Sequence, residues 1–232
     1  MQNLIQYIFI AILSWVPIRN LTPYGETEDE ARARLHSVAE DIVTIAMDKS
    51  EPSVFARADG RVKTALLQAS IASMETGFQK FVDTGDCNQA NYRADRRGNC
   101  DGGHAFSLWQ IHVFGGGYLL LEDGTLGSVM YSPSVAQAHP EWIIKGADLV
   151  SDRKKAIRVA QRSERASLNQ FHSLCGYSGE HCEDGEHPKA KARFDRAVEY
   201  YQKHPFTDPI PEPVDLATIA SNAAPVSTDS SD

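Results

Sequence analysis

One glutamate, Glu75, has the surroundings that acid chemistry requires. It lies near the end of an apolar stretch, flanked by Met74 and Phe78 and followed closely by Gly77. Burial disfavours the ionised form of a carboxyl, and so does the negative end of a helix dipole. A carboxyl that stays neutral can protonate the oxygen of a glycosidic bond. Glu75 is therefore the first candidate for a catalytic residue, although most glutamates at helix ends are simply solvated.

A second segment with a distinctive order of residues is 103–111, which reads Gly-His-Ala-Phe-Ser-Leu-Trp-Gln-Ile. Together with the segment 75–78, Glu-Thr-Gly-Phe, it resembles the soluble lytic transglycosylase and goose-type lysozyme-like family. In that family a helix ends in Glu-Ser-x-Phe, and a later segment reads Gly-Leu-Met-Gln-Ile. Here Thr76 replaces the serine, while Ser107 and Trp109 replace the glycine and the methionine. The resemblance spans roughly residues 62–202.

The resemblance implies a role for each matched position. Glu75 would be the catalytic acid, and Gln110 would line the cleft beside the sugar. For Trp109, contact with the sugar and ordinary core packing are equally consistent with the sequence. The other predicted substrate contacts are Phe78, Ser107, Leu108, Ile111, Phe171 and Tyr177.

A third family motif, Tyr-Asn-x-Gly at the end of a helix, supplies a hydroxyl that contacts the catalytic glutamate. In this chain Phe171 stands at that position and has no hydroxyl. His172 or Tyr177 could supply the missing donor, and their spacing does not decide between them. The orientation of Glu75 is the point on which the sequence departs most from the family.

The resemblance implies a lytic transglycosylase that cuts the MurNAc-GlcNAc β-1,4 bond of peptidoglycan glycan strands. Most glycosidases need two carboxyl groups, and no second one lies in a matched motif here. The substrate's own N-acetyl group and C6 hydroxyl would replace it, leaving a 1,6-anhydro end. Alternatively, Asp86 or Asp101 could activate water, as in a hydrolysing muramidase. Two further alternatives are a chitin-cleaving enzyme of the same fold and a non-catalytic lysozyme-like component of a phage tail or secretion apparatus.

The composition of the chain limits the kinds of partner and cofactor that it could bind. The chain has 232 residues and a net charge of −8, and this acidic balance argues against nucleic acid as a partner. Asp95, Asn99 and Asp101 lack the alternating spacing of a calcium loop, and His104 and His112 are too loosely placed for a metal site. We therefore expect neither a metal nor another cofactor.

The four cysteines form two close pairs in the sequence: Cys87 with Cys100, and Cys175 with Cys182. Three pairings are possible, and this local one is the simplest. Paired cysteines indicate an oxidising compartment. We therefore expect a location outside the cytoplasm, in the periplasm or cell envelope or secreted, or carriage in a phage virion.

The elements that must position these residues are mostly helices. A helix is predicted to begin at Thr27 or Glu28, and further helices are predicted over 62–74, 140–150, 153–171 and around 189–203. The stretch 119–126 fits a small hairpin or a loop equally well. The expected fold is mainly α: a lysozyme-like, two-lobed helical domain with long disulfide-stapled loops.

Three regions are expected along the chain. Residues 1–26 hold an apolar segment and a linker, residues 27–204 form the transglycosylase domain, and residues 205–232 form a disordered tail rich in Pro, Ser and Asp. The apolar residues 4–16 are few for a membrane span and lack the basic start of a signal peptide. They could be a degenerate signal or anchor that contacts a membrane, or a helix buried in the fold or in a protein assembly.

Overall fold

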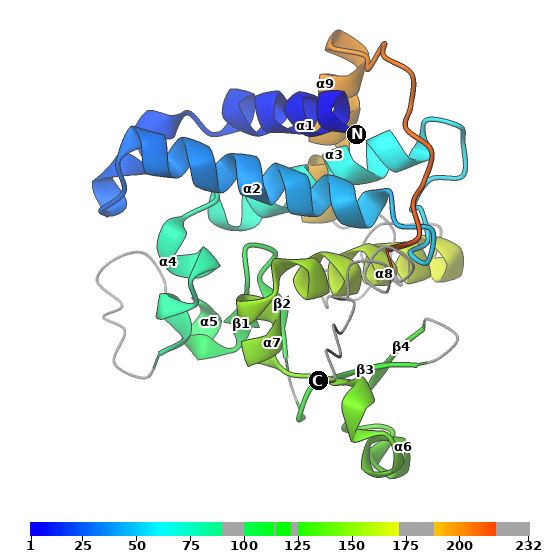
Figure 1. The fold of residues 1–232 in the computed structure, drawn as a ribbon. Coiled ribbons are helices and arrows are strands. Elements are labelled where there is room, and N and C mark those ends of the chain that lie inside the picture. Colours follow the sequence, from blue (N-terminus) through cyan, green and yellow to red (C-terminus); the bar gives the residue numbers. More distant parts are fainter. Residues whose placement is uncertain (90–99, 114, 122–124, 172–187, 217–232) are drawn as a thin grey trace, which may run out of the picture.

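The computed structural model describes residues 1–89, 100–113, 115–121, 125–171 and 188–216 of the chain. These residues form a mainly helical structure, as predicted (Figure 1). The helices are α1 (Gln2–Trp15), α2 (Glu28–Ala46), α3 (Gly60–Thr76), α4 (Lys80–Asp83), α5 (Cys100–Gly103), α6 (Pro133–Ala138), α7 (Gly146–Ser151), α8 (Arg153–Phe171) and α9 (Pro188–Lys203). The strands are β1 (Ala105–Phe106), β2 (Ile111–His112), β3 (Tyr118–Leu120), β4 (Leu126–Ser128) and β5 (Ile143–Ile144).

Helix α3 lies at the centre of the helical part and packs against α1, α2, α8 and α9. Thirteen of its seventeen residues are buried, so the helix is enclosed on nearly every side. It ends at Gly77, which adopts the left-handed conformation that favours glycine and donates its N–H to the Ser73 carbonyl. The predicted helix 62–74 and its stop are thus confirmed.

Helix α2 begins where the sequence predicts. The Thr27 side chain accepts from the backbone N–H of Glu30, and the Glu30 carboxylate accepts from the backbone N–H of Thr27. This capping box satisfies two backbone donors that have no partner within the helix. The apolar residues that repeat at helical spacing along α2 are buried: Ala31, Leu35, Val38, Ala39, Ile42, Val43, Ile45 and Ala46.

The apolar N-terminal segment forms α1, which lies along α2 and α3 (Figure 1). Its residues Leu4, Ile8, Ala11 and Ile12 are completely buried. Of the two interpretations of residues 4–16, this structure therefore has the helix that packs into the fold. None of the helices in the described ranges is long and apolar enough to cross a membrane.

Residues 205–216, predicted as part of a disordered tail, include two that contact the rest of the fold in this structure. The ring of Phe206 packs edge-on against Tyr7, with 5.2 Å between the ring centres. Val214 exchanges backbone hydrogen bonds with the chain after α2, donating to the Met47 carbonyl and accepting from the Lys49 N–H. An extended, proline-rich segment can therefore be held by a short ladder of backbone bonds. The rest of the predicted tail lies outside the described residues.

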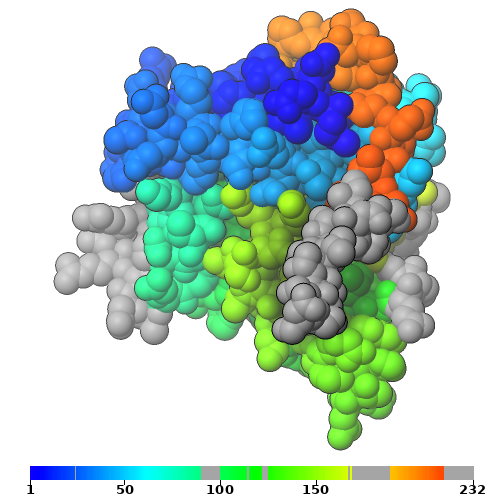
Figure 2. Space-filling model, viewed as in Figure 1, coloured from blue at the N-terminus to red at the C-terminus, as the bar shows by residue number. Residues whose placement is uncertain are grey.

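The middle of the chain differs from the predicted single helix over 140–150. It forms a 3-10 turn (Pro140–Trp142), strand β5 and helix α7. The helical pattern is interrupted because β5 pairs with β3, which also pairs with β4 in an antiparallel sheet of order β4-β3-β5. The β3–β4 pair corresponds to the predicted hairpin, and β1 pairs with β2 separately. In Figure 2, on the face shown, the atoms of α1 and α2 cover one end of the molecule and the green residues occupy the other.

Candidate functional site

Glu75 lies in the last turn of α3 and lines a surface pocket of about 360 Å³. The same pocket is lined by Gln110 from the turn between β1 and β2, and by Cys100 and Asp101 of α5. The side chain of Glu75 is 23% exposed, so its carboxylate is accessible without standing in open solvent. The structure thus brings together the two sequence segments that carried the family resemblance.

Thr76 joins these two segments. Its hydroxyl lies within hydrogen-bonding distance of two carbonyls, those of Ala72 (3.0 Å) and Leu108 (3.2 Å). It also accepts the backbone N–H of Phe78 at 3.2 Å. A buried hydroxyl that bonds the helix, the following turn and the segment 103–111 fixes the position of the preceding residue, Glu75.

The turn that presents Gln110 is tight. Ser107 and Gln110 both have positive φ, at 64° and 49°, and the Gln110 N–H donates to the Ser107 carbonyl at 3.0 Å. Left-handed backbone is uncommon for residues with a Cβ and often marks functional turns. Ser107 stands where the resembled family has glycine, the residue that adopts this conformation most easily.

Five of the predicted substrate contacts have side chains that the structure places in the core. Phe78, Leu108 and Trp109 are completely buried, and Ser107 and Ile111 are nearly so. The indole N–H of Trp109 donates to the Gln68 carbonyl at 3.1 Å, which attaches the turn to α3. These side chains pack in the core and support the wall of the pocket from the inside. The apolar ones among them are more stable buried than facing water. Tyr177 and the side chain of Phe171 lie outside the described part of the structure.

Arg193 of α9 forms an ion pair with Glu75, in which guanidinium Nη2 donates to carboxylate Oε1. The Arg193 side chain is only 4% exposed. Two further contacts fix α9 against α3: the Ser70 hydroxyl donates to the Arg193 carbonyl at 2.8 Å, and Arg196 Nη1 donates to the Ser73 hydroxyl at 2.8 Å. Glu75 therefore faces an opposite charge that the sequence interpretation did not include.

A second acid lies behind this pair. Glu164 of α8 is 1% exposed, and its burial raises the pKa of the carboxyl from 4.5 to about 8, while the charge of Arg193 opposes the rise. The sequence interpretation missed Glu164 and gave Arg193 no role. Both could have been found from helical spacing, because Glu164 follows the buried Ile157 and Ala160 and Arg193 lies between the buried Ala190 and Ala197.

Asp101 and Asp86, considered above as bases for water, occupy different places. Asp101 lines the pocket, and its carboxylate lies 3.3 Å from Nδ1 of His112. Asp86 is not among the residues that line it, and accepts a hydrogen bond from the Thr84 hydroxyl at 2.8 Å. The predicted Cys87–Cys100 disulfide is confirmed, with 5.5 Å between the Cα atoms, and it fixes the residue before Asp101. Cys175 and Cys182 lie outside the described residues.

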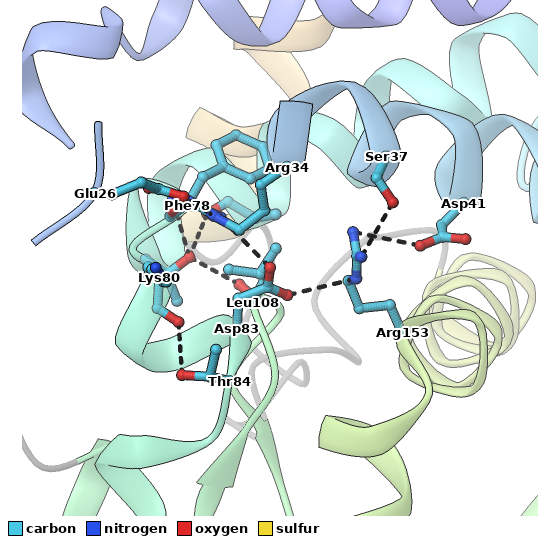
Figure 3. Close-up of polar contacts among 12 residues, drawn as sticks. Glu26, Arg34, Ser37, Asp41, Phe78, Lys80, Asp83, Thr84, Leu108 and Arg153 are labelled. Carbon is cyan, nitrogen blue, oxygen red and sulfur yellow. Dashed lines mark hydrogen bonds and ion pairs between the residues drawn. The ribbon is translucent and has the colours of Figure 1, made fainter. Parts of the chain in front are cut away.

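A buried network of charges supports the turn after Glu75 (Figure 3). Arg34 of α2 donates to both carboxylate oxygens of Glu26, at 2.7 and 2.8 Å, and to the Phe78 carbonyl at 2.8 Å. Asp83 of α4 lies between Arg34 and Arg153, at 3.4 and 3.6 Å. Burial raises the pKa of the Asp83 carboxyl, and both arginines oppose that rise. The network ties the base of the pocket to α2 and α8.

Comparison of the chain with protein-family models, with curated proteins and with solved structures finds no match. Within the described ranges, no group of three or more His, Cys, Asp or Glu side chains could hold a metal ion. The fold and the site thus define a mainly helical domain whose pocket combines a carboxylate, an amide and a second, exposed carboxylate.

Proposed function

We propose that this chain is a peptidoglycan-cleaving glycosidase with a lysozyme-like, two-lobed fold, in which Glu75 protonates the oxygen of the scissile β-1,4 bond. The observation that carries the proposal is that Glu75 and Gln110, remote in the sequence, line one pocket. The buried hydroxyl of Thr76 and the indole of Trp109 support this arrangement by holding the two segments together.

The preferred reaction is that of a lytic transglycosylase. The substrate's N-acetyl group stabilises the cationic sugar carbon as the leaving oxygen takes the proton of Glu75. The ionised Glu75 then accepts the proton of the sugar's C6 hydroxyl, and that oxygen bonds to the same carbon to form the 1,6-anhydro ring. Glu75 must carry a proton at the start of this sequence, so its ion pair with Arg193 has to open or weaken when substrate binds.

Hydrolysis by a muramidase is the second candidate, and one observation favours it. Asp101 lines the same pocket as Glu75, where it could activate a water molecule as general base. The partner is a glycan strand in either case. The Cys87–Cys100 disulfide supports a site of action outside the cytoplasm, in the cell envelope or from a virion.

Digestion of purified peptidoglycan tests the proposal. The wild-type chain is expected to release muropeptides with 1,6-anhydro ends, detected by mass spectrometry, and Glu75→Gln to release at least about a hundredfold less, since a general acid contributes roughly 10²–10⁴-fold to a rate. Glu199→Gln, a change of the same kind at an exposed position of α9, is the matched control. Reducing ends that disappear in Asp101→Asn would assign the reaction to the muramidase instead. Equal digestion by wild type and Glu75→Gln would leave the domain a non-catalytic role.

A further inference from the structure

We infer that Glu164 and Arg193 are positioning residues for Glu75: one buried guanidinium is shared between the carboxylate at the pocket and a second carboxyl hidden behind it. The inference rests on the proposed function of Glu75 and adds two residues to its site. It concerns how Glu75 is held, because neither Glu164 nor Arg193 is among the residues that line the pocket.

The three side chains come from three helices. Glu75 is on α3, Glu164 on α8 and Arg193 on α9, and α3 packs directly against both of the other helices. Exposure falls from 23% at Glu75 to 4% at Arg193 and 1% at Glu164. The cluster therefore joins one carboxylate at the pocket to two buried groups, and the charge of Arg193 acts on both carboxyls.

A buried charge is stable only with a counter-charge, and this cluster has one cation for two acids. Within the described structure, Oε2 of Glu164 is buried without a hydrogen-bond partner. Because burial raises the pKa of Glu164 to about 8, its carboxyl is neutral at lower pH. Arg193 then pairs with the Glu75 carboxylate and holds it at the pocket wall.

The charged neighbours on the surrounding helices are engaged elsewhere. On α8, Arg162 pairs with Glu51 at 2.7 Å, and Arg165 donates to the Val54 carbonyl at 2.9 Å. On α9, Arg196 donates to the Ser73 hydroxyl of α3. On α2, Asp41 faces Arg153 and Lys154 near the start of α8. The charge of Arg193 opposes the rise that burial causes in the pKa of Glu164. Ionisation of Glu164 therefore acts first on Arg193 and, through Arg193, on Glu75.

A pH-dependent consequence follows. Above about pH 8 Glu164 becomes a carboxylate and competes with Glu75 for Arg193, so the hold on Glu75 weakens. Glu75 is then less well oriented before substrate opens the ion pair. The effect is expected on the rate at saturating peptidoglycan and not on its binding, because Glu164 is not among the residues that line the pocket. A group that titrates near pH 8 is ~90% ionised one pH unit higher, so the saturating rate should fall roughly tenfold between pH 7 and pH 9.

The decisive measurement does not depend on activity. In the full chain labelled with 13C at glutamate side-chain carboxyls, the NMR signals of Glu75 and Glu164 are identified by their loss in Glu75→Gln and Glu164→Gln. The Glu164 signal should titrate near pH 8, and the Glu75 signal should move at the same pH in wild type but not in Glu164→Gln. Glu164→Gln keeps the side-chain shape, and comparison of its amide spectrum with that of wild type checks its fold.

A Glu75 signal that stays constant between about pH 7 and pH 9, or that moves identically in Glu164→Gln, overturns the shared guanidinium. A coupled pair of signals in a chain that does not cut peptidoglycan would keep the coupling and refute the proposed function alone. In an active chain, the saturating rate of wild type should fall roughly tenfold from pH 7 to pH 9, and that of Glu164→Gln, relative to its own rate at pH 7, should fall severalfold less. Superimposable pH profiles of wild type and Glu164→Gln would refute the positioning role.

Discussion

Replacing Glu164 with glutamine should stabilise the fold by an amount that depends on pH. In the unfolded chain the Glu164 carboxyl titrates at 4.5, and in the folded chain burial raises its pKa to about 8. Between these values the folded state binds one more proton than the unfolded state, so the stability of wild type falls as pH rises. The contribution is fully present below the unfolded value and is lost above about pH 8. Glutamine has no proton to lose and removes this dependence.

The size of the effect follows from the interval between the two pKa values. Each pH unit of difference corresponds to about 1.4 kcal/mol, so the interval from 4.5 to about 8 corresponds to roughly 5 kcal/mol. Solvent screening does not reduce this figure much, since Glu164 is 1% exposed. The free energy of unfolding of Glu164→Gln minus that of wild type should therefore rise by roughly 4 kcal/mol between pH 4.5 and pH 8.5, since each end point lies close to one of the two pKa values.

Urea unfolding measures this difference directly. Both proteins are unfolded with the disulfide intact at closely spaced pH values, and the buried Trp109 contributes a fluorescence signal. The urea dependence of the free energy should be the same in both proteins, so that the midpoints report stability. Glu199→Gln, at an exposed position of the same bundle, should give a difference from wild type that changes little with pH. A Glu164→Gln difference that is equally flat would refute the assignment of a buried, protonated acid at this position.

Three further changes test the supports of the pocket. Arg34→Met should lower the free energy of unfolding by roughly 3–5 kcal/mol, because Glu26 and Asp83 would remain buried without this partner. Chemical unfolding measures this free energy, and a loss below about 1 kcal/mol would contradict a stabilising role for the network. Trp109→Phe should destabilise the fold by roughly 1–3 kcal/mol because the hydrogen bond to the Gln68 carbonyl is lost, and the dissociation constant for sugar oligomers should change by no more than about twofold. A tenfold weaker affinity of a folded variant, measured by calorimetry, would indicate that Trp109 contacts the sugar directly. Cys87→Ser with Cys100→Ser opens a link across 13 positions and should lower stability by about 3 kcal/mol, whereas unchanged thermal unfolding would show that the hydrogen bonds of Asn88 to the carbonyls of Gly103 and Ala105 suffice.

The helices could be predicted because their signals are local. The capping residues of α2, the apolar spacing of its core positions and the left-handed Gly77 that ends α3 all lie within a few residues of the features that they determine. The break between Pro140 and α7 could not be predicted in this way. Strand β5 exists because it pairs with β3, about two dozen residues earlier, and helical spacing carries no information about that pairing.

The residues of the candidate site differ in the same way: some have local sequence signals, and others depend on packing between distant segments. Glu75 and Gln110 were found because short motifs present them, and the structure places both at one pocket. The sequence left Trp109 open because an aromatic residue in a motif can line a ligand site or fill the core, and its packing against α3 places it in the core. Glu164 was missed because it has no motif. It occupies a core-facing position of an otherwise ordinary amphipathic helix, and its raised pKa depends on helices that close over it.

The contact between Arg193 and Glu75 bears on the main departure from the resembled family. That family orients its catalytic glutamate with a tyrosine hydroxyl from the helix that here ends in Phe171. In this chain, which has no hydroxyl at position 171, a donor to Glu75 comes from the next described helix, where Arg193 pairs with its carboxylate. A guanidinium holds a carboxylate more strongly than a hydroxyl does, but it favours the charged form that cannot donate a proton. Below about pH 8 the buried Glu164 carboxyl is neutral and leaves the charge of Arg193 to Glu75, so the guanidinium can orient the Glu75 carboxylate until substrate opens the ion pair.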